Sequence, residues 1–323
     1  MRVVAVGGGT GLSSLLRGIK HLVPDTIRDL SAIVTVADNG GSSGRLREEM
    51  QVPAPGDIRN CIVALAEDED ILTQVFQYRF SNGNGLKGHS FGNLFLSVLT
   101  KITGDFLDAV EITSNILKIK GEIIPSTDKL VDIVAQFSDG AIIKGETQIT
   151  EYGKQLKGKI VRIWMEPSDV EAPQKALEKI RDADFIILGP GSLYTSIIPN
   201  LLVKDIKEAI LNSKAYKIYI CNVMTQYGET YKFSASQHIK AIHETVGEEF
   251  IDAAIINTTL PPHELIEKYM RENSQPVTAD VPEIVDMGIT VYAKDLIEAG
   301  DYVRHNPEKL TAVLLEVMEK ARV

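Results

Sequence analysis

The stretch Val3–Ile19, VVAVGGGTGLSSLLRGI, constrains the fold more than any other part of the chain. Its β-branched apolar start predicts a buried parallel strand, and its later leucines, at helical spacing, predict a helix. Between the two lies Gly7-Gly8-Gly9-Thr10-Gly11. This order places backbone N–H groups and the positive end of a helix at one point, where glycines let an anion approach the main chain. The segment therefore predicts a cradle for phosphate or nucleotide with these contacts: Gly8, Gly9, Thr10 and Gly11.

This cradle matches neither common phosphate-binding motif. Counted from Gly7 or from Gly9, the third glycine of the dinucleotide pattern is replaced by Leu12 or Ser14, and no Gly-Lys-Ser/Thr follows. The alternative is a tight strand-to-helix turn that binds nothing. Four glycines in five positions exceed what such a turn needs, and this favours the ligand.

Length and charge narrow the class of protein. The 323 residues are 44% hydrophobic, and no apolar run approaches the roughly 18 residues of a membrane span. We therefore expect one α/β domain over residues 1–323, without a membrane span. A net charge of −10 argues against nucleic acid as a partner, because its backbone requires clustered Lys and Arg. The two distant cysteines, Cys61 and Cys221, favour reduced core thiols in a cytoplasmic protein.

Later apolar runs predict the rest of the sheet. Those of strand length are Ser31–Ala37, Asp184–Leu188, Lys217–Cys221, Ala253–Ile256 and Thr290–Ala293. Because they alternate with helical patterns, they predict an α/β domain with an open, doubly wound and mostly parallel sheet. Between about residues 120 and 165, strand-like runs around an Asp139-Gly140 turn predict a small antiparallel β insertion.

Polar loops that follow the strands predict the binding site, because the carboxyl ends of parallel strands share one edge of a sheet. Asp38 follows the second strand, where it would bind a metal ion or a ribose hydroxyl, or cap the turn. Asp57 opens a later helix as a second metal ligand or as an N-cap. Further predicted nucleotide contacts are Asn39, Ser42, Ser43, His89, Asn93, Gly189, Gly191, Ser192, Thr225, Gln226 and Arg304. A helix-capping role for His89 is the alternative to phosphate binding.

Five motifs resemble the 2-phospho-L-lactate transferase (CofD-like) family. In chain order they are Gly7–Gly11, Ala37–Gly44, Pro55–Asn60, Gly88–Asn93 and Gly189–Ser192. The β insertion and Asn222–Gln226 with Gly228-Glu229-Thr230 are similar to its YvcK-type branch, the gluconeogenesis factors. The resemblance implies a three-layer α/β/α, Rossmann-like fold that binds a nucleotide. It also implies that Asp38 and Asp57 lie on the metal side and that the first and last of the five motifs contact the nucleotide.

The resemblance leaves two functions open. The YvcK-type branch is associated with UDP-sugar binding, cell shape and growth on gluconeogenic carbon sources, without an established reaction. It implies a regulatory protein that binds a UDP-sugar such as UDP-GlcNAc and has a protein partner in cell-wall synthesis. The transferase branch implies Mg²⁺-dependent transfer of a nucleotide-activated phosphoester group. An aromatic content of 6% offers little to stack a tricyclic deazaflavin, which favours the sugar nucleotide. A scaffold with a vestigial pocket is a third reading, and assembly as a homo-oligomer stays open.

Overall fold

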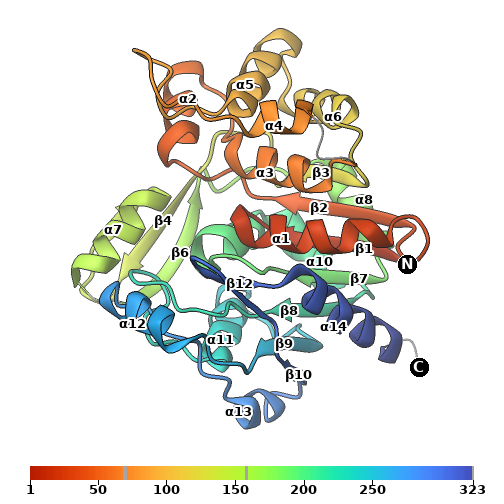
Figure 1. Cartoon of the computed structure of the whole chain (residues 1–323), viewed down its shortest axis with the longest axis vertical. Helices are drawn as coiled ribbons and strands as arrows, with labels where there is room; N and C mark the ends of the chain where they lie inside the picture. Colours follow the sequence, from red (N-terminus) through yellow and green to blue (C-terminus); the bar gives the residue numbers. More distant parts are fainter. Residues whose placement is uncertain (68–70, 157–158, 322–323) are drawn as a thin grey trace.

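A parallel sheet forms the middle layer of the computed structural model, which describes residues 1–67, 71–156 and 159–321 (Figure 1). In the described part the sheet has seven strands, in the order β10-β9-β8-β7-β1-β2-β3, and every pairing is parallel. The strands are β1 (Arg2–Gly7), β2 (Asp29–Val34), β3 (Glu122–Pro125), β7 (Phe185–Leu188), β8 (Tyr216–Ile220), β9 (Ala253–Asn257) and β10 (Thr290–Lys294). The predicted α/β fold with a mostly parallel sheet is confirmed.

The sheet has a switch point between β1 and β7. From β1 the chain adds β2 and β3 on one side, and from β7 it adds β8, β9 and β10 on the other. At such a point the loops that leave the two strands run to opposite sides, which leaves a crevice at the carboxyl edge of the sheet. The two glycine-rich loops predicted to bind nucleotide follow these two strands.

Helices cover both faces of the sheet. Helices α1 (Gly9–Ile19), α3 (Gly56–Leu65) and α14 (Pro307–Lys320) form one layer, in which α1 packs against both others. Helices α8 (Gln174–Asp182) and α10 (Lys204–Asn212) pack together behind the sheet (Figure 1).

The other helices lie beyond β3 or follow the later strands of the sheet. Beyond β3 lie α2 (Gly41–Met50), α4 (Ile71–Gln77), α5 (Phe91–Thr103) and α6 (Phe106–Ile116) (Figure 1). A 3₁₀ turn (Lys20–Leu22) follows α1. After β7 the chain forms a π-helical turn (Leu193–Ile197) and α9 (Ile198–Leu202). The later helices are α11 (Ala235–Val246), α12 (His263–Arg271) and α13 (Val281–Val285).

The antiparallel insertion differs from the predicted range of about 120–165. It contains β4 (Asp132–Phe137), β5 (Ile142–Lys144) and β6 (Ile160–Glu166), which lie in the spatial order β5-β4-β6. Helix α7 (Glu146–Leu156) connects β5 to β6 along the chain. Residues 157–158 of the predicted range lie outside the described residues. β3 belongs to the main sheet instead, because its short apolar run carries no periodicity that separates a parallel edge strand from a hairpin strand. A further antiparallel pair, β11 (Ile297–Ala299) and β12 (Val303–His305), was not predicted.

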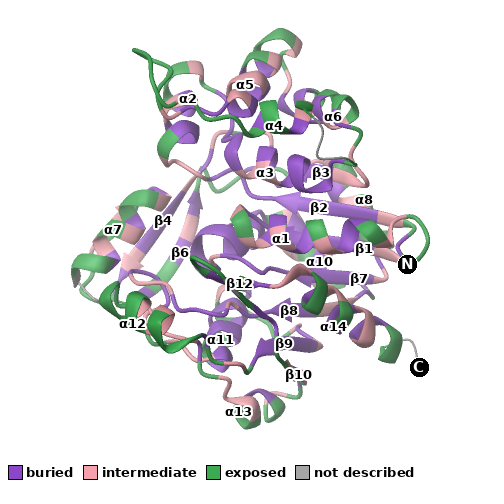
Figure 2. Ribbon diagram, viewed as in Figure 1, coloured by how far each residue is buried: buried purple, intermediate pink, exposed green. Residues whose placement is uncertain are grey.

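The strands of the main sheet, apart from the partly exposed edge strand β10, are buried between the helix layers (Figure 2). The central strands β1 and β7 are lined by β-branched side chains, which pack well on a sheet covered on both faces. Cys61 and Cys221 are free and buried in this core, as expected for core thiols. In the described part of the chain, no helix has the length and apolar character needed to cross a membrane.

Ile187, at the centre of β7 and 0% exposed, tests this core. Ile187→Ala should lower the free energy of unfolding by about 2–5 kcal/mol, because it removes buried methyl groups and leaves a cavity. Val161→Ala on β6, at a side chain 60% exposed, is the control and should change it by less than about 0.5 kcal/mol. Urea unfolding measures both. Equal losses would mean that β7 is not the centre of the core.

Candidate functional site

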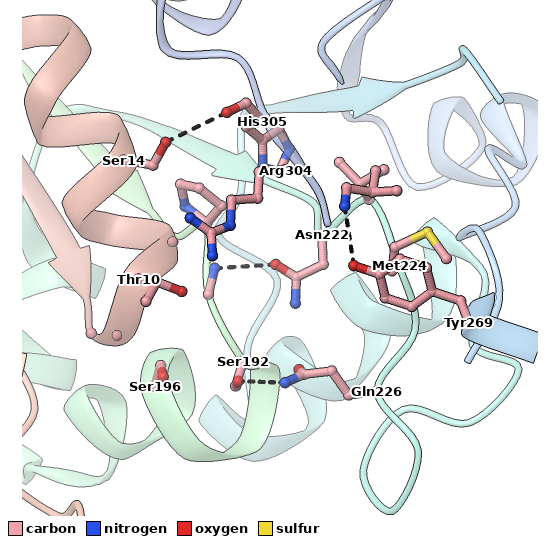
Figure 3. A pocket seen from close by; sticks show the side chains of 17 residues that line it. Thr10, Ser14, Ser192, Ser196, Asn222, Met224, Gln226, Tyr269, Arg304 and His305 are labelled. Carbon is pink, nitrogen blue, oxygen red and sulfur yellow. Dashed lines mark hydrogen bonds between the residues drawn. The ribbon is translucent and has the colours of Figure 1, made fainter. Parts of the chain in front are cut away.

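A cavity of about 240 Å³ lies at the switch point, where the two glycine-rich loops meet (Figure 3). Its walls come from the start of α1, the loops after β7 and β8, helix α12 and strand β12. The predicted nucleotide contacts that line it are Gly8, Gly9, Thr10, Gly11, Gly191, Ser192, Gln226 and Arg304. Two segments distant in sequence, the first loop and β12, therefore meet at one cavity.

Glycines allow the two loops to approach each other. A Cβ on Gly11 would lie 2.5 Å from the carbonyl oxygen of Pro190, closer than real Cβ contacts. Gly9 has φ +64°, a left-handed conformation that glycine adopts without strain. The cavity wall is consequently main chain, which any bulkier residue at these positions would disturb.

The start of α1 makes the cavity attractive to anions. The first N–H groups of a helix have no partner inside the helix, and the helix dipole adds partial positive charge there. Thr10 and Gly11, in the first turn of α1, line the cavity. From the opposite side the side chain of Arg304 extends toward this turn (Figure 3). A helix start facing a guanidinium is an arrangement suited to phosphate.

Buried polar atoms without partners also line the cavity. Gln226 donates from Nε2 to Ser192 Oγ at 2.6 Å, whereas its Oε1 has no hydrogen-bond partner in the described structure. The same holds for Nε2 of His305, whose pKa is lowered to about 4 by burial. The imidazole of His305 is therefore neutral at neutral pH. Because buried polar groups are normally paired, these atoms indicate polar ligand groups in the cavity.

The two predicted metal ligands lie beside the cavity, at helix starts. Asp38 accepts a hydrogen bond from Gly40 N at 2.8 Å, just before α2. Asp57 is not the N-cap of its own helix, as one prediction had it, because Pro55 holds that position. Its carboxylate lies instead against the first loop: a Cβ on Gly8 would lie 2.6 Å from Oδ2, and the Gly9 N–H favours the ionised form.

Two further carboxyl groups, Glu146 and Glu229, were missed by the sequence predictions. Burial raises the pKa of Glu146 to about 9, and repulsion from Asp38, Asp57 and Glu229 adds to this. Burial likewise raises the pKa of Glu229 to about 7. The pKa of Asp57 is also raised to about 7, first by burial and then by repulsion from Asp38. Both missed residues stand in the tripeptide Gly-Glu-Thr, at 145–147 and 228–230, a repetition that could have pointed to them.

The four carboxyl groups do not form a ready metal centre. Among the described residues, no three or more His, Cys, Asp or Glu side chains are arranged to hold a metal ion. Mg²⁺ needs only one or two protein carboxylates when phosphates and water complete its shell. Binding of Mg²⁺ by Asp38 and Asp57 therefore stays a prediction.

The other predicted contacts lie outside the cavity. Ser42 Oγ is 3.0 Å from His89 Nδ1 and accepts from Asn93 Nδ2 at 3.1 Å. Asn39 Oδ1 accepts from Thr147 N and so holds the start of α7. Residues in this group are Asn39, Ser42, Ser43, His89, Asn93, Gly189 and Thr225. Their binding roles stay predictions, and the cavity adds Asn222 and Tyr269 as lining residues.

The raised pKa of Asp57 predicts how stability depends on pH. Folded Asp57 keeps its proton up to about pH 7, whereas its ordinary pKa is 3.8, so its favourable contribution is lost as pH rises through about 7. Asp57→Asn should be more stable than the wild type at about pH 8, by on the order of 2 kcal/mol, and by much less at about pH 5. Urea unfolding at both pH values measures this, with the exposed Asp286→Asn as control. A wild-type-to-variant difference that is the same at both pH values would contradict the burial of this carboxyl.

Comparisons with known proteins identify the family to which the chain belongs. Residues 3–297 match the family described as 2-phospho-L-lactate transferase CofD. A protein of Aquifex aeolicus is 57% identical over 321 residues, 99% of this chain and 97% of its own length. A Bacillus subtilis protein named gluconeogenesis factor is 44% identical over 99% of this chain and 98% of its own.

A solved structure shows the same fold. The crystal structure of a Bacillus halodurans protein superposes with a TM-score of 0.92 at 44% identity, and covers 97% of this chain and 99% of that one. The family match extends from β1 to β11 and includes both glycine-rich loops. The chain therefore belongs to the CofD family, in which its relatives include proteins named gluconeogenesis factors.

Proposed function

We propose that the cavity binds a UDP-sugar such as UDP-GlcNAc, and that the protein is a regulatory binding protein for cell shape and cell-wall synthesis during gluconeogenic growth. The observation that carries the proposal is the start of α1 facing Arg304 across one cavity. In this proposal the diphosphate lies between the first-turn N–H groups and the guanidinium. A protein partner in cell-wall synthesis receives the signal.

The wall of the cavity near α12 suits a nucleoside. Tyr269 and Met224 line it (Figure 3), and Val303 N donates to Tyr269 Oη at 3.1 Å, which fixes the phenol ring. A fixed aromatic ring beside a thioether offers a base a flat apolar contact. The free Oε1 of Gln226 can then accept from a base or sugar N–H or O–H.

A binding role is favoured over catalysis by the groups that line the cavity. The nucleophile types among the lining residues are hydroxyls, and His305 is the one imidazole among them. The hydroxyls belong to Thr10, Ser14, Ser192, Ser196 and Tyr269. A pKa of about 4 makes His305 a weak proton acceptor at neutral pH. The name of the Bacillus subtilis relative supports a role in carbon metabolism without specifying a reaction.

A transferase is the second candidate, and it is favoured by Asp57. Its carboxyl group lies at the start of α1 with a pKa of about 7, suitable for a general base. The same carboxylate would repel a diphosphate on this helix unless a proton or a cation lay between them. Asp38 and Asp57 would hold Mg²⁺ there, and the ion would neutralise a leaving diphosphate.

Substitution of Arg304 tests UDP-sugar binding. Arg304→Gln should weaken UDP-GlcNAc binding at least about tenfold, because it removes a charge-assisted contact to the diphosphate. Arg271→Gln, at an exposed arginine of α12, is the matched control and should bind like the wild type. Isothermal titration calorimetry gives both affinities. Wild-type affinity in Arg304→Gln would remove Arg304 from the site.

The two carboxylates separate the two candidate functions. In the Asp38→Asn, Asp57→Asn double variant, a regulatory protein should still bind UDP-GlcNAc without Mg²⁺, within about tenfold of the wild type. A transferase should instead lose both Mg²⁺-dependent binding and turnover, because the ion has no ligands left. Calorimetry with and without Mg²⁺, together with mass spectrometry of the incubated nucleotide, distinguishes the two.

A further inference from the structure

Arg59, on α3, is a buried cation without an anionic partner. Its side chain is 8% exposed, one guanidinium nitrogen donates to Asn60 Oδ1 at 2.6 Å, and Nε has no hydrogen-bond partner. Within the residues that the structure describes, it takes part in no ion pair. Asp57, two residues earlier, favours its charged form only from a distance. Because a buried charge is costly unless paired, Arg59 lacks a counter-charge.

The surroundings of Arg59 are positive as well. Burial and repulsion from Arg79 lower the pKa of Arg59 to about 10. The pKa of His89 is lowered by burial and then by Arg45, with Arg79 contributing and Glu49 opposing. The side chains of the protein therefore leave an unbalanced positive charge at this point of the fold. A bound anion would balance it.

The start of α5 completes this cluster. Gly92, in its first turn, lies directly on the Arg59 side chain: a Cβ there would be 2.8 Å from Cδ and 2.7 Å from the Phe76 carbonyl oxygen. The main chain of Gly92 thus fixes the direction of Arg59. Asn93, one residue further, is buried, and its Nδ2 donates to Ser42 Oγ at 3.1 Å, which ties the start of α5 to α2.

We propose that Arg59, Arg79, His89, Asn93 and Ser42 form a second anion site that binds a phosphate group, either free phosphate or the phosphate of a small monoester. We name these five residues the α5 cluster. None of them lines the nucleotide cavity, so the site can be filled independently of it. The guanidinium groups of Arg59 and Arg79 donate to the phosphate oxygens, and the buried charge of Arg59 gains its counter-ion. The N–H groups of Phe91 and Asn93 take no part, because they donate to Tyr78 O and Ser90 Oγ.

Thermal unfolding of the full chain, with inorganic phosphate titrated against potassium chloride of equal ionic strength, tests the site. The wild type should gain stability in a saturable manner, beyond the chloride control. Arg79→Gln, at an exposed side chain, should weaken the apparent phosphate affinity at least about tenfold, and Arg59→Met should abolish the response. Without phosphate, Arg59→Met should be no less stable than the wild type, because it removes an unpaired buried charge.

Two controls separate this site from the nucleotide cavity. Arg304→Gln should keep the response to phosphate, and Arg79→Gln should keep its affinity for UDP-GlcNAc, so either site can fail without the other. Arg271→Gln should respond like the wild type. A stronger response to glycerol 3-phosphate than to phosphate would identify a monoester as the ligand, and an equal one would identify free phosphate.

The proposal is overturned by an unchanged phosphate response in Arg79→Gln, or by a wild-type response no larger than that to chloride. If Arg59→Met does not fold, Arg79→Gln alone decides. A folded Arg59→Met that loses stability without phosphate and keeps the phosphate response would make Arg59 a structural residue and also overturn the proposal.

Discussion

The close contact between the start of α1 and the loop after β7 is the constraint on which the site depends. Gly11 stands where any Cβ would meet the Pro190 carbonyl oxygen, so the two loops are in main-chain contact at the switch point of the sheet. This contact aims the first turn of α1 at the cavity. Strand β12 then brings Arg304 to the opposite wall, although almost 300 residues separate the two in sequence.

Charge is distributed unevenly along the carboxyl edge of the sheet. One side of the first loop faces Arg304, and the other faces buried carboxyl groups whose pKa values are raised to about 7 for Asp57 and about 9 for Glu146. In the proposed function, a nucleotide phosphate at the start of α1 would lie between the Arg304 guanidinium and Asp57, whose ionised carboxylate would repel it. Protonation or a divalent cation on the carboxyl side relieves the repulsion, which links phosphate binding to pH and to metal.

The sequence predicted the features that depend on local pattern. The strand, glycine loop and helix of Val3–Ile19 and the later buried strands follow from short-range periodicity, and the structure contains them. The prediction that β3 belongs to the antiparallel insertion was wrong. The short apolar run Glu122-Ile123-Ile124-Pro125 looks the same whether it forms a parallel edge strand or a hairpin strand.

Features that depend on tertiary contact were not predictable in this way. Tyr269 reaches the cavity from α12, whose sequence is that of an ordinary surface helix. Burial raises the pKa of Glu146, at the start of α7 in the insertion, and this residue lies close enough to Asp38 and Asp57 for their charges to raise it further. Asn39 and Thr225 are engaged in hydrogen bonds that hold other segments. Residue type identified polar loops, but only the fold shows which of their side chains face the cavity.

The most direct test of the central claim is calorimetric titration of UDP-GlcNAc, UDP-glucose, GDP, GTP and NAD, each with and without Mg²⁺. The expected result is selective binding of a UDP-sugar that remains chemically unchanged during long incubation. Selective, strictly Mg²⁺-dependent binding of a guanine nucleotide would contradict it and favour the transferase. Binding of none of these ligands would contradict both functions and leave the cavity at the start of α1 without an assigned ligand.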